Sequence, residues 1–309
     1  MLEKLLKYLK RPSLLYLFAA AKGVTNFIPD RVHLAILFRI QIGNRLNLRD
    51  PKTFNEKVQW LKLNDRNPLY TTLVDKVAVK QWVSERIGDE YVTKTYQEWS
   101  NASDILIDSL PKRFVLKTNH DSGGVVICLD KEIFDLAAAK RFLSKQLESN
   151  YFWICREWPY KKVPPKVFAE EYVEADSSIG AGTIDYKFYC FNGEPRFLYL
   201  SCGLDDHSTA RISFLNLDWS KAEFMRADYQ PFNSLPPKPD CFDQMKDLAR
   251  VLAKDIPFVR VDFFIANGKP RFSEMTFSPC GGFMPFEPKE WDEKIGDMLD
   301  LPSSMGKGR

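Results

Sequence analysis

The stretch Phe258-Val-Arg-Val-Asp-Phe-Phe-Ile-Ala-Asn-Gly-Lys-Pro-Arg-Phe-Ser-Glu-Met-Thr-Phe-Ser-Pro279 holds two apolar, β-prone runs on either side of Asn267-Gly268. This pattern predicts a β-hairpin. Because side chains alternate along a strand, Arg260 and Asp262 lie on one face of the first strand, between two phenylalanines. Charges in this position are unusual for a hairpin whose role is purely structural.

The length of the turn decides which charged residues of the hairpin face each other. A two-residue turn would place Asp262 opposite Ser273, with Glu274 on the far face. A three-residue turn over 267–269 instead places Asp262 opposite Glu274 and Arg260 opposite Thr276. We expect the three-residue turn, because Pro270, which lacks an N–H, then lies at the edge of the turn, where proline is tolerated.

Two carboxylates that face each other on one side of a sheet repel. A cation between Asp262 and Glu274 would relieve this repulsion, and paired oxygen ligands suit Mg²⁺ bound together with phosphate. The hairpin alone leaves open the alternative that these charges belong to a solvated outer face.

The composition describes a globular chain without a dominant charge. Its 309 residues are 45% hydrophobic and 28% charged, with a formal net charge of +3. That charge is too small to indicate a nucleic-acid partner. The six cysteines are dispersed without a CxxC pair, which disfavours a zinc site and a disulfide framework and suits a reducing compartment. The three histidines give little support to a His-rich metal site or a triad hydrolase.

The N-terminal region is basic and helical in pattern. Leu2, Leu5, Leu6 and Leu9 recur at helical spacing with lysines between them, and residues 14–21 form a short apolar run. The run is too short to span a membrane. Packing against the domain, contact with an anionic membrane surface and a signal peptide all remain open here.

Helix patterns occupy several later segments. Thr53 is the expected N-cap of a helix over 54–63, and Glu56 completes a capping box. Apolar spacing predicts further helices over 73–87, 135–147 and 242–252.

A strand over 114–117 ends at Lys117 and runs into a polar loop with Ser122, Gly123 and Gly124, and 125–128 forms the returning strand. The backbone N–H groups of such a loop can wrap phosphate oxygens, although an ordinary hairpin would give the same pattern. A lysine at the end of an apolar strand favours the functional interpretation.

Strands are also predicted over 167–173, which contains Glu170 and Glu171, and over 184–191, where Asp185 and Lys187 share a face. A solvated salt bridge is the alternative for this last pair. The irregular mixture of strands and helices predicts an α+β fold in two lobes. Neither GxGxxG nor GxxxxGK[ST] occurs, so the two common phosphate-binding fingerprints are absent. Asp205, Asp206 and His207 resemble a metal cluster, but they fall in a polar loop where solvated charges or acceptor binding are alternatives.

These segments in this order resemble the ATP-grasp superfamily, and more closely its TupA-like branch of polysaccharide and teichuronopeptide biosynthesis, which is amidoligase-like. The closer resemblance is carried by five motifs: Asn55-Glu-Lys-Val-Gln-Trp60; Asp75-Lys76; Phe114-Val-Leu-Lys117 with Gly123-Gly124; Asp185-Tyr-Lys-Phe188; and Arg260-Val-Asp-Phe263 with Ser273-Glu-Met-Thr276. The resemblance implies a helical region over 1–72, a first ATP-grasp lobe with the glycine flap over 73–162, and a second lobe with the metal-binding hairpin over 163–309. The nucleotide would lie between two antiparallel sheets.

The resemblance also implies a role for each site residue. Lys76 and Lys117 would hold the ATP phosphates, with the flap residues Ser122, Gly123 and Gly124. The segment of Glu170 and Glu171 would form the hinge whose backbone reads adenine, and Glu174 would hold the ribose. Asp262 and Glu274 would bind Mg²⁺, and Arg260 would steady the transferring phosphoryl group or an oxyanion, with Lys187 also able to reach phosphate and Asp185 beside it. Thr276 departs from the asparagine that many ATP-grasp enzymes carry at this position, which places the second metal in doubt.

The activity implied is an ATP- and Mg²⁺-dependent carboxylate–amine ligase that joins an amino acid to a uronic acid of a surface or capsular polysaccharide precursor. A kinase that phosphorylates a glycan hydroxyl and a non-catalytic assembly protein of a polysaccharide locus are the alternatives. The expected partners are a small-molecule or glycan substrate, other polysaccharide biosynthesis proteins and, through the N-terminal helix, the inner face of the membrane. A cytoplasmic location is expected because ATP is cytosolic.

Overall fold

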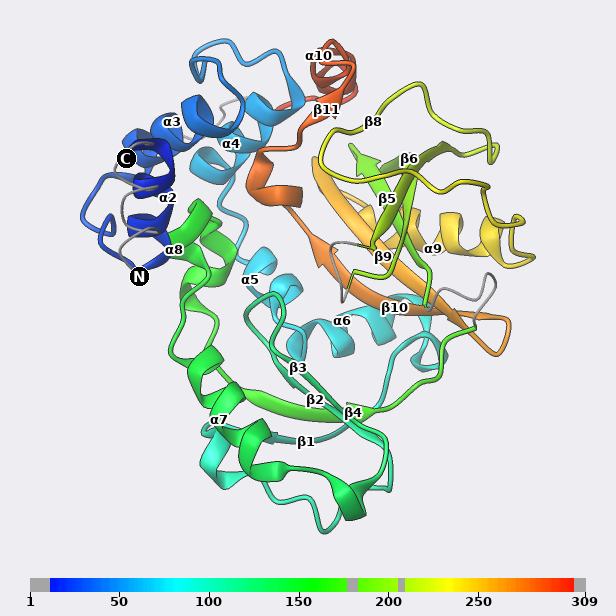
Figure 1. Cartoon of the computed structure of the whole chain (residues 1–309). Helices are drawn as coiled ribbons and strands as arrows, with labels where there is room; N and C mark the ends of the chain where they lie inside the picture. Colours follow the sequence, from blue (N-terminus) through cyan, green and yellow to red (C-terminus); the bar gives the residue numbers. More distant parts are fainter. Residues whose placement is uncertain (1–11, 177–182, 205–208, 303–309) are drawn as a thin grey trace.

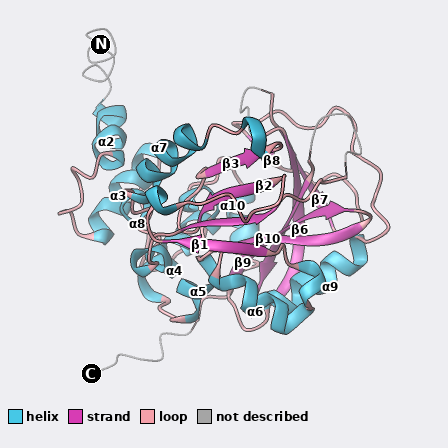
Figure 2. Ribbon diagram, turned by 90° about the horizontal axis from the view of Figure 1, so that it is seen from below, coloured by secondary structure: helices cyan, strands magenta, loops and turns pink. Residues whose placement is uncertain are grey.

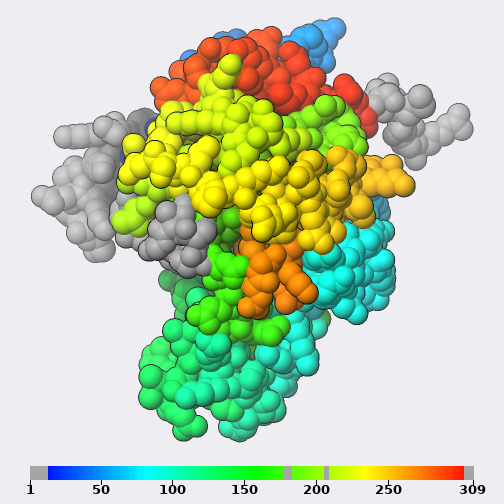
Figure 3. Space-filling view, turned by 90° about the vertical axis from the view of Figure 1, so that its right-hand side faces the viewer, coloured from blue at the N-terminus to red at the C-terminus, as the bar shows by residue number. Residues whose placement is uncertain are grey.

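The computed structural model describes residues 12–176, 183–204 and 209–302. Two antiparallel sheets and a short two-stranded ribbon combine with helices, which confirms the predicted α+β class. Figure 1 shows a smaller lobe at the bottom, a larger lobe above it and a group of N-terminal helices at the upper left. In the space-filling view the smaller lobe protrudes beneath the larger one (Figure 3).

The smaller lobe is built on a four-stranded sheet with the order β1-β4-β2-β3, formed by Thr95–Trp99 (β1), Phe114–Thr118 (β2), Val125–Cys128 (β3) and Val167–Glu171 (β4). Helix α7, Leu136–Leu147, covers one face and buries Ala139 and Leu143 against the sheet. The sheet therefore extends this lobe to Glu171, beyond the boundary expected at residue 162.

The larger lobe is built on a five-stranded sheet with the order β10-β9-β5-β6-β7, formed by Asp185–Phe191 (β5), Glu194–Cys202 (β6), Arg211–Asn216 (β7), Phe258–Ala266 (β9) and Lys269–Thr276 (β10). One face packs on helices α6, Ala78–Ile87, and α9, Phe242–Ala253, which lie side by side (Figure 2). The other face carries an aromatic cluster that includes Phe54, Tyr189 and Phe214. Both faces of this sheet are therefore covered, and the strands are buried along most of their length.

The hairpin β9–β10 has the predicted residue pairs but not the predicted turn. Asp262 lies opposite Glu274 and Thr276 lies opposite Arg260, as expected. The predicted three-residue turn is wrong, because Ala266 pairs with Lys269 and leaves a two-residue turn. Asn267 and Gly268 both have positive φ (52° and 70°), which is the type I′ geometry that Asn-Gly favours. A β-bulge between Phe272 and Glu274 supplies the extra residue that restores the register.

The predicted single helix over 73–87 is divided. Helix α5, Leu69–Val74, ends before Asp75, and α6 begins at Ala78. The Asp75 carboxylate accepts hydrogen bonds from the backbone N–H groups of Val77 (2.9 Å) and Ala78 (3.2 Å), as an N-capping side chain does. Lys76 therefore lies in a connection between helices.

The N-terminal region is helical in its described part, with α2 at Pro12–Ala21, α3 at Asp30–Gln41 and α4 at Phe54–Asn64. The capping box of Thr53 and Glu56 at the start of α4 is confirmed. No helix within the described ranges is long and apolar enough to cross a membrane. Leu2, Leu5, Leu6 and Leu9, and the Asp205-Asp206-His207 loop, lie outside the described residues.

The remaining elements are short: α8 at Phe152–Cys155, β8 at Met225–Arg226, β11 at Phe286–Glu287, α10 at Trp291–Gly296, and the 3₁₀ turns η1 at Asp89–Tyr91, η2 at Ala102–Asp104, η3 at Lys131–Ile133, η4 at Trp158–Lys162 and η5 at Pro279–Gly282. Turn η5 begins three residues after the end of β10, and Trp158 and Pro159 of η4 line a small pocket together with Phe277 and Ser278 from the same connection.

Candidate active site

A cavity of about 260 Å³ lies between the two sheets. One wall comes from the smaller lobe, with apolar side chains of β2, β3 and β4 such as Val115, Ile127 and Phe168. The other wall comes from the hairpin β9–β10, with Phe264 and Phe272. The charged side chains in its lining are Lys76, Lys80, Lys117, Glu170 and Glu171.

Glu170 is the buried anion at the centre of the lysine-rich wall. Its carboxylate accepts a hydrogen bond from Lys80 Nζ at 2.7 Å and forms an ion pair with Lys117. Burial disfavours the ionised form of Glu170, but the charges of Lys117 and Lys80 prevail and lower its pKa. Lys117 keeps 31% of its side chain exposed toward solvent, so this ammonium is available to a ligand.

Lys76 holds the flap of the smaller lobe. Its Nζ donates to the carbonyls of Asp121 (2.5 Å) and Thr118 (3.3 Å), and its backbone N–H donates to the carbonyl of Asn119. The Asp121 carboxylate lies 3.7 Å from the same ammonium. Burial lowers the pKa of Lys76, with Asp121 and Glu274 acting in the opposite direction. Lys76 thus links the flap loop to the connection between α5 and α6.

The flap requires its two glycines. Gly123 has a φ of 96°, a region that L side chains rarely adopt, and a Cβ at Gly124 would lie 1.7 Å from Thr118 Oγ1. Ser122 and Gly123 are exposed, whereas Gly124 is buried. The tip of the flap is therefore open to solvent and its base is closely packed.

The hairpin carries a second, denser charge cluster. The Arg260 guanidinium holds Asp262 through two hydrogen bonds, from Nε to Oδ1 (2.7 Å) and from Nη2 to Oδ2 (2.6 Å). The same Nη2 donates to Glu274 (2.8 Å) and to the hydroxyl of Thr276 (3.0 Å). Lys187 Nζ donates to Asp262 Oδ2 at 2.7 Å and lies 3.6 Å from Asp185. Asp185 and Lys187 therefore belong to a buried network across β5 and β9.

This cluster has two cations and three carboxylates, so its formal charge is 2 − 3 = −1. Burial disfavours ionisation of Glu274, but Arg260 and Lys187 overcome this effect and lower its pKa to about 2. Glu274 is consequently ionised throughout the physiological pH range. Its side chain is 39% exposed, whereas that of Asp262 is fully buried.

The donor set suits a magnesium ion whose coordination sphere is completed by phosphate oxygens and water. One carboxylate oxygen of Glu274 accepts no hydrogen bond from the described residues, and the residual negative charge favours a cation. Asp262 can contribute only if Lys187 and Arg260 move away from it. Within the described ranges no group of three or more His, Cys, Asp or Glu side chains is arranged to hold a metal ion by itself.

Other predicted residues fall at different distances from the cavity. Glu171 lines it, while Glu174 lies outside its lining and pairs with Arg113 on the surface at 3.3 Å. Sequence reasoning missed Lys80, although it follows Lys76 by four positions, one helical turn. It also missed Glu157, a buried carboxylate near Arg260.

The chain matches the family described as TupA-like ATPgrasp over residues 56–300, which is most of its length. The chain belongs to the TupA-like ATP-grasp family. The match covers both sheets, the flap and the hairpin, so this family assignment accounts for the two-lobed fold around the cavity.

Solved structures give weaker likenesses. The D-alanine–D-alanine ligase from Bacillus anthracis complexed with ATP is 18% identical, with 72% of this chain and 57% of that chain covered and a TM-score of 0.38. The ATP-grasp ligase PsnB, complexed with a phosphomimetic variant of its minimal precursor, Mg and ADP, is 11% identical, with 84% and 65% covered and a TM-score of 0.40. The L-amino acid ligase from Bacillus licheniformis is 12% identical, with 81% and 53% covered and a TM-score of 0.39. This TupA-like chain thus spans less than two thirds of each of these structures, and no curated protein matches it by sequence.

The two opposed carboxylates of the hairpin should differ in their importance for stability. Asp262→Asn removes the charge of the fully buried carboxylate that holds both Arg260 and Lys187, and we expect a loss of about 3–5 kcal/mol in the free energy of unfolding. Glu274→Gln, at the half-exposed edge of the cluster, should cost about 1 kcal/mol or less. Urea unfolding of both variants measures the difference. Equal losses would contradict the assignment of Asp262 as the structural centre of the cluster.

Proposed function

We propose that this protein is an ATP- and Mg²⁺-dependent carboxylate–amine ligase that forms an amide through an acyl phosphate and releases ADP and phosphate. The observation that carries the proposal is the distribution of charge around one cavity. Lys117 of the smaller lobe, and Lys76 and Lys80 around the start of α6, line the cavity. The Arg260–Asp262–Glu274 cluster lies outside this lining, on the hairpin whose Phe264 and Phe272 form the opposite wall, and the charge of Glu274 acts on Lys76. A nucleotide triphosphate with its metal complements both walls.

Adenine fits the apolar part of the cavity. Val125 and Ile127 of β3 are 40% and 53% exposed, although both are apolar, and both line this cavity. Phe168 and Phe272 face the same space from the two lobes. An aromatic base would cover this exposed apolar surface, and the backbone that follows β4, at Tyr172 and Val173 in the cavity lining, could hydrogen-bond to it.

The phosphates then extend toward Lys117 and the flap. Lys117 offers an exposed ammonium, and the exposed backbone at Ser122 and Gly123 can close over phosphate oxygens. Glu274 would hold Mg²⁺, which when bound supplies charge neutralisation for phosphoryl transfer. Arg260 donates from one nitrogen to both Glu274 and Thr276, and in the proposed reaction its positive charge would steady the transferring phosphoryl group. Burial raises the pKa of Asp262, and Arg260 and Lys187, which both donate to its carboxylate, act in the opposite direction.

A carboxylate substrate would attack the γ-phosphate, and an amine would then displace phosphate from the acyl phosphate. Membership of the TupA-like family supports a uronic acid of a surface polysaccharide precursor as the carboxylate and an amino acid as the amine. Dependence on ATP supports a cytoplasmic site of action.

Removal of one phosphate-binding charge should weaken nucleotide binding without unfolding the protein. Lys117→Met leaves Glu170 paired with Lys80, so the fold is retained, and loss of a charge-assisted hydrogen bond should raise the Kd for Mg²⁺-AMPPNP by about 10- to 100-fold. Thermal stabilisation by the analogue measures this effect through mass action.

Lys145→Met, at an exposed position on α7, is the matched control and should bind like the wild type. If saturating Mg²⁺-AMPPNP does not stabilise the wild-type protein, the proposed function is wrong.

The reaction class should appear in the mass of the product. Incubation with ATP, Mg²⁺, a uronic-acid glycan and a pool of amino acids should give a product whose mass equals the sum of glycan and amino acid minus water. A product heavier by a phosphate group would instead identify a kinase. Glu274→Gln, which preserves the fold, should abolish either product.

A further inference from the structure

The segment before η4 is fixed beside the end of the hairpin by a buried lysine. Lys62 Nζ donates to the carbonyl of Cys155 (2.7 Å) and to that of Gly281 in η5 (2.7 Å). Figure 1 shows η5, the orange turn that follows β10, near α4 and α8. A Cβ at Gly281 would lie 2.7 Å from the sulfur of Cys155, so the two segments are in close contact.

Aromatic packing fixes the same two segments a few residues away. The ring of Tyr70 lies 6.1 Å from that of Trp158 and 4.4 Å from that of Phe277, measured between centroids. Glu157 precedes Trp158, and Phe277 follows Thr276. Glu157 is therefore placed next to the end of the hairpin that carries the charge cluster.

Glu157 is only 4% exposed, and no described residue donates a hydrogen bond to its carboxylate. Lys62, Glu274 and Arg260 are the charged groups that act on it. The uncharged titratable groups that face it are Tyr151, Cys155, Tyr160 and Cys280. A buried carboxylate without a hydrogen bond is costly, and a native protein that retains one requires an explanation.

We infer that Glu157 is the binding group and proton acceptor for the amine substrate, an inference that rests on the proposed ligase function. The amine approaches as an ammonium ion. The carboxylate of Glu157, to which no described side chain donates a hydrogen bond, supplies the counter-charge for this ammonium. The Tyr151 and Tyr160 rings, with centroids 5.1 Å apart, form an edge-to-face pair near it.

Amide formation moves two protons from the ammonium and breaks one carbon–oxygen bond. The ammonium gives one proton to Glu157, and the freed nitrogen lone pair attacks the carbonyl carbon of the acyl phosphate. The carbon–oxygen bond to phosphate then breaks, and inorganic phosphate leaves with the bonding electrons. The second proton lost from nitrogen passes to the departing phosphate or to solvent, and Glu157 later releases its proton to solvent.

The environment of Glu157 is consistent with this role. Burial raises its pKa to about 7 from an ordinary value of 4.5, with Lys62 acting in the opposite direction. A carboxyl group whose pKa is near the working pH can both accept and release a proton. Because its folded-state pKa is raised, ionised Glu157 destabilises the folded protein. This cost is fully present above about pH 7 and disappears as the pH falls toward the ordinary value.

Calorimetric titration with ethanolamine, in the presence of saturating Mg²⁺-AMPPNP, tests the inference without the natural substrate. Its amine stays protonated between pH 6 and pH 8. Wild-type protein should bind ethanolamine at pH 8 and more weakly at pH 6, and Glu157→Gln should bind at least 10-fold more weakly at pH 8. Ethylene glycol, which replaces the ammonium by a hydroxyl, should not bind. Glu132→Gln, at an exposed carboxylate in η3, is the matched control and should behave like the wild type.

A second measurement separates a functional from a structural role. Glu157→Gln should raise the Tm at pH 8, and the gain should shrink as the pH is lowered to 5. The inference is overturned if the wild type does not bind ethanolamine, or if the wild type and Glu157→Gln bind it equally. It is also overturned if the variant has a lower Tm than the wild type at pH 8. If Mg²⁺-AMPPNP does bind, each of these results leaves the proposed ligase function intact.

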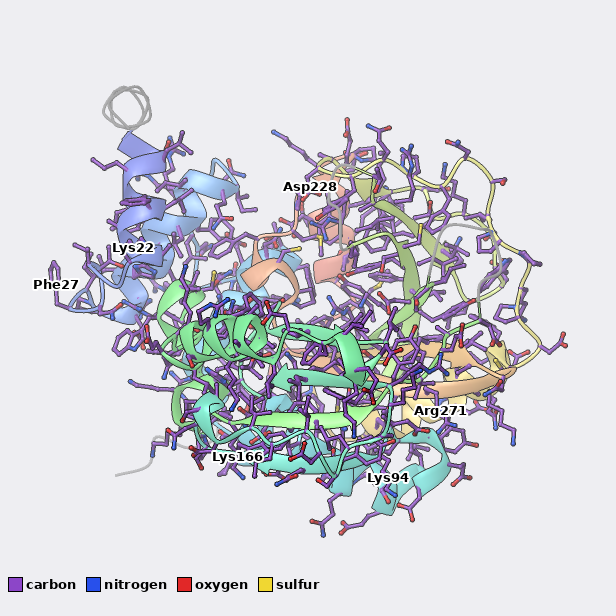
Figure 4. All side chains as sticks on the ribbon, turned by 60° about the horizontal axis from the view of Figure 1, so that its bottom comes forward. Lys22, Phe27, Lys94, Lys166, Asp228 and Arg271 are labelled. Carbon is purple, nitrogen blue, oxygen red and sulfur yellow. The ribbon has the colours of Figure 1, made fainter. Side chains whose placement is uncertain are left out.

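A separate observation concerns the N-terminal helices. Leu15, Phe18, Val24, Phe27 and Val32 are all exposed, and Phe27 is 84% exposed. Figure 4 shows Phe27 projecting away from the body of the protein, with Lys22 on the same side. The sequence that precedes these helices adds Lys4, Lys7, Lys10 and Arg11, with Glu3 as the single acidic residue before Asp30. Asp30 is paired with Arg156 at 3.0 Å.

We infer that this surface, defined by Leu15, Phe18, Val24, Phe27 and Val32, docks on an anionic lipid bilayer. Exposed aromatic and aliphatic side chains can insert at the level of the headgroups, while the positive charge of Lys22 is attracted to the negative surface.

Sedimentation with vesicles tests this inference. Wild-type protein should bind vesicles of phosphatidylcholine with about one quarter phosphatidylglycerol, more weakly at high salt, and should not bind pure phosphatidylcholine. The double variant Phe18→Glu, Phe27→Glu should lose at least 10-fold in affinity. Ile133→Glu, at an equally exposed position in η3, should not. Equal binding of the double variant, or dimerisation of the wild type through this surface without lipid, would overturn the inference.

Discussion

The bidentate contact between Arg260 and Asp262 is the interaction on which the arrangement of the larger lobe depends. Both side chains lie on one strand, and the carboxylate is fully buried. A buried carboxylate of this kind is tolerated only with its partners in place. Lys187 from β5 and Glu274 and Thr276 from β10 complete the network, so three neighbouring strands are joined by charge as well as by their backbone ladder.

Under the proposed function, this network also determines which charges the larger lobe presents to a nucleotide. The saturated carboxylate, Asp262, is buried on the protein side, and the partly free carboxylate, Glu274, faces the solvent. The smaller lobe has a similar arrangement around Glu170, which is buried between Lys80 and Lys117. Each lobe therefore keeps one neutralised buried anion and presents one accessible charge, Lys117 or Glu274. These two opposite charges complement the phosphates and metal of a nucleotide.

Much of this arrangement could be predicted from the sequence, because strand parity and the order of the motifs are local properties. The opposition of Asp262 and Glu274 was predicted from a three-residue turn. The pairing is correct although that turn is wrong, because the β-bulge between Phe272 and Glu274 gives the same register. The β-bulge before Glu274 could not be predicted, because one extra residue in a strand leaves little trace in the apolar pattern. The type I′ turn was indicated by Asn267-Gly268, whose N–H groups are both held by Asp176 at 2.8 Å. Lys80 and Glu157 depend on contacts between segments far apart in the chain, which no local pattern reveals.

A crystal structure of the protein with Mg²⁺-AMPPNP tests the central claim most directly. The account predicts adenine between Phe168 and Phe272, phosphate oxygens within hydrogen-bonding distance of Lys117, and Mg²⁺ bound to Glu274. A nucleotide bound outside the cavity between the two sheets, or a metal ion with no contact to Glu274, would contradict the account.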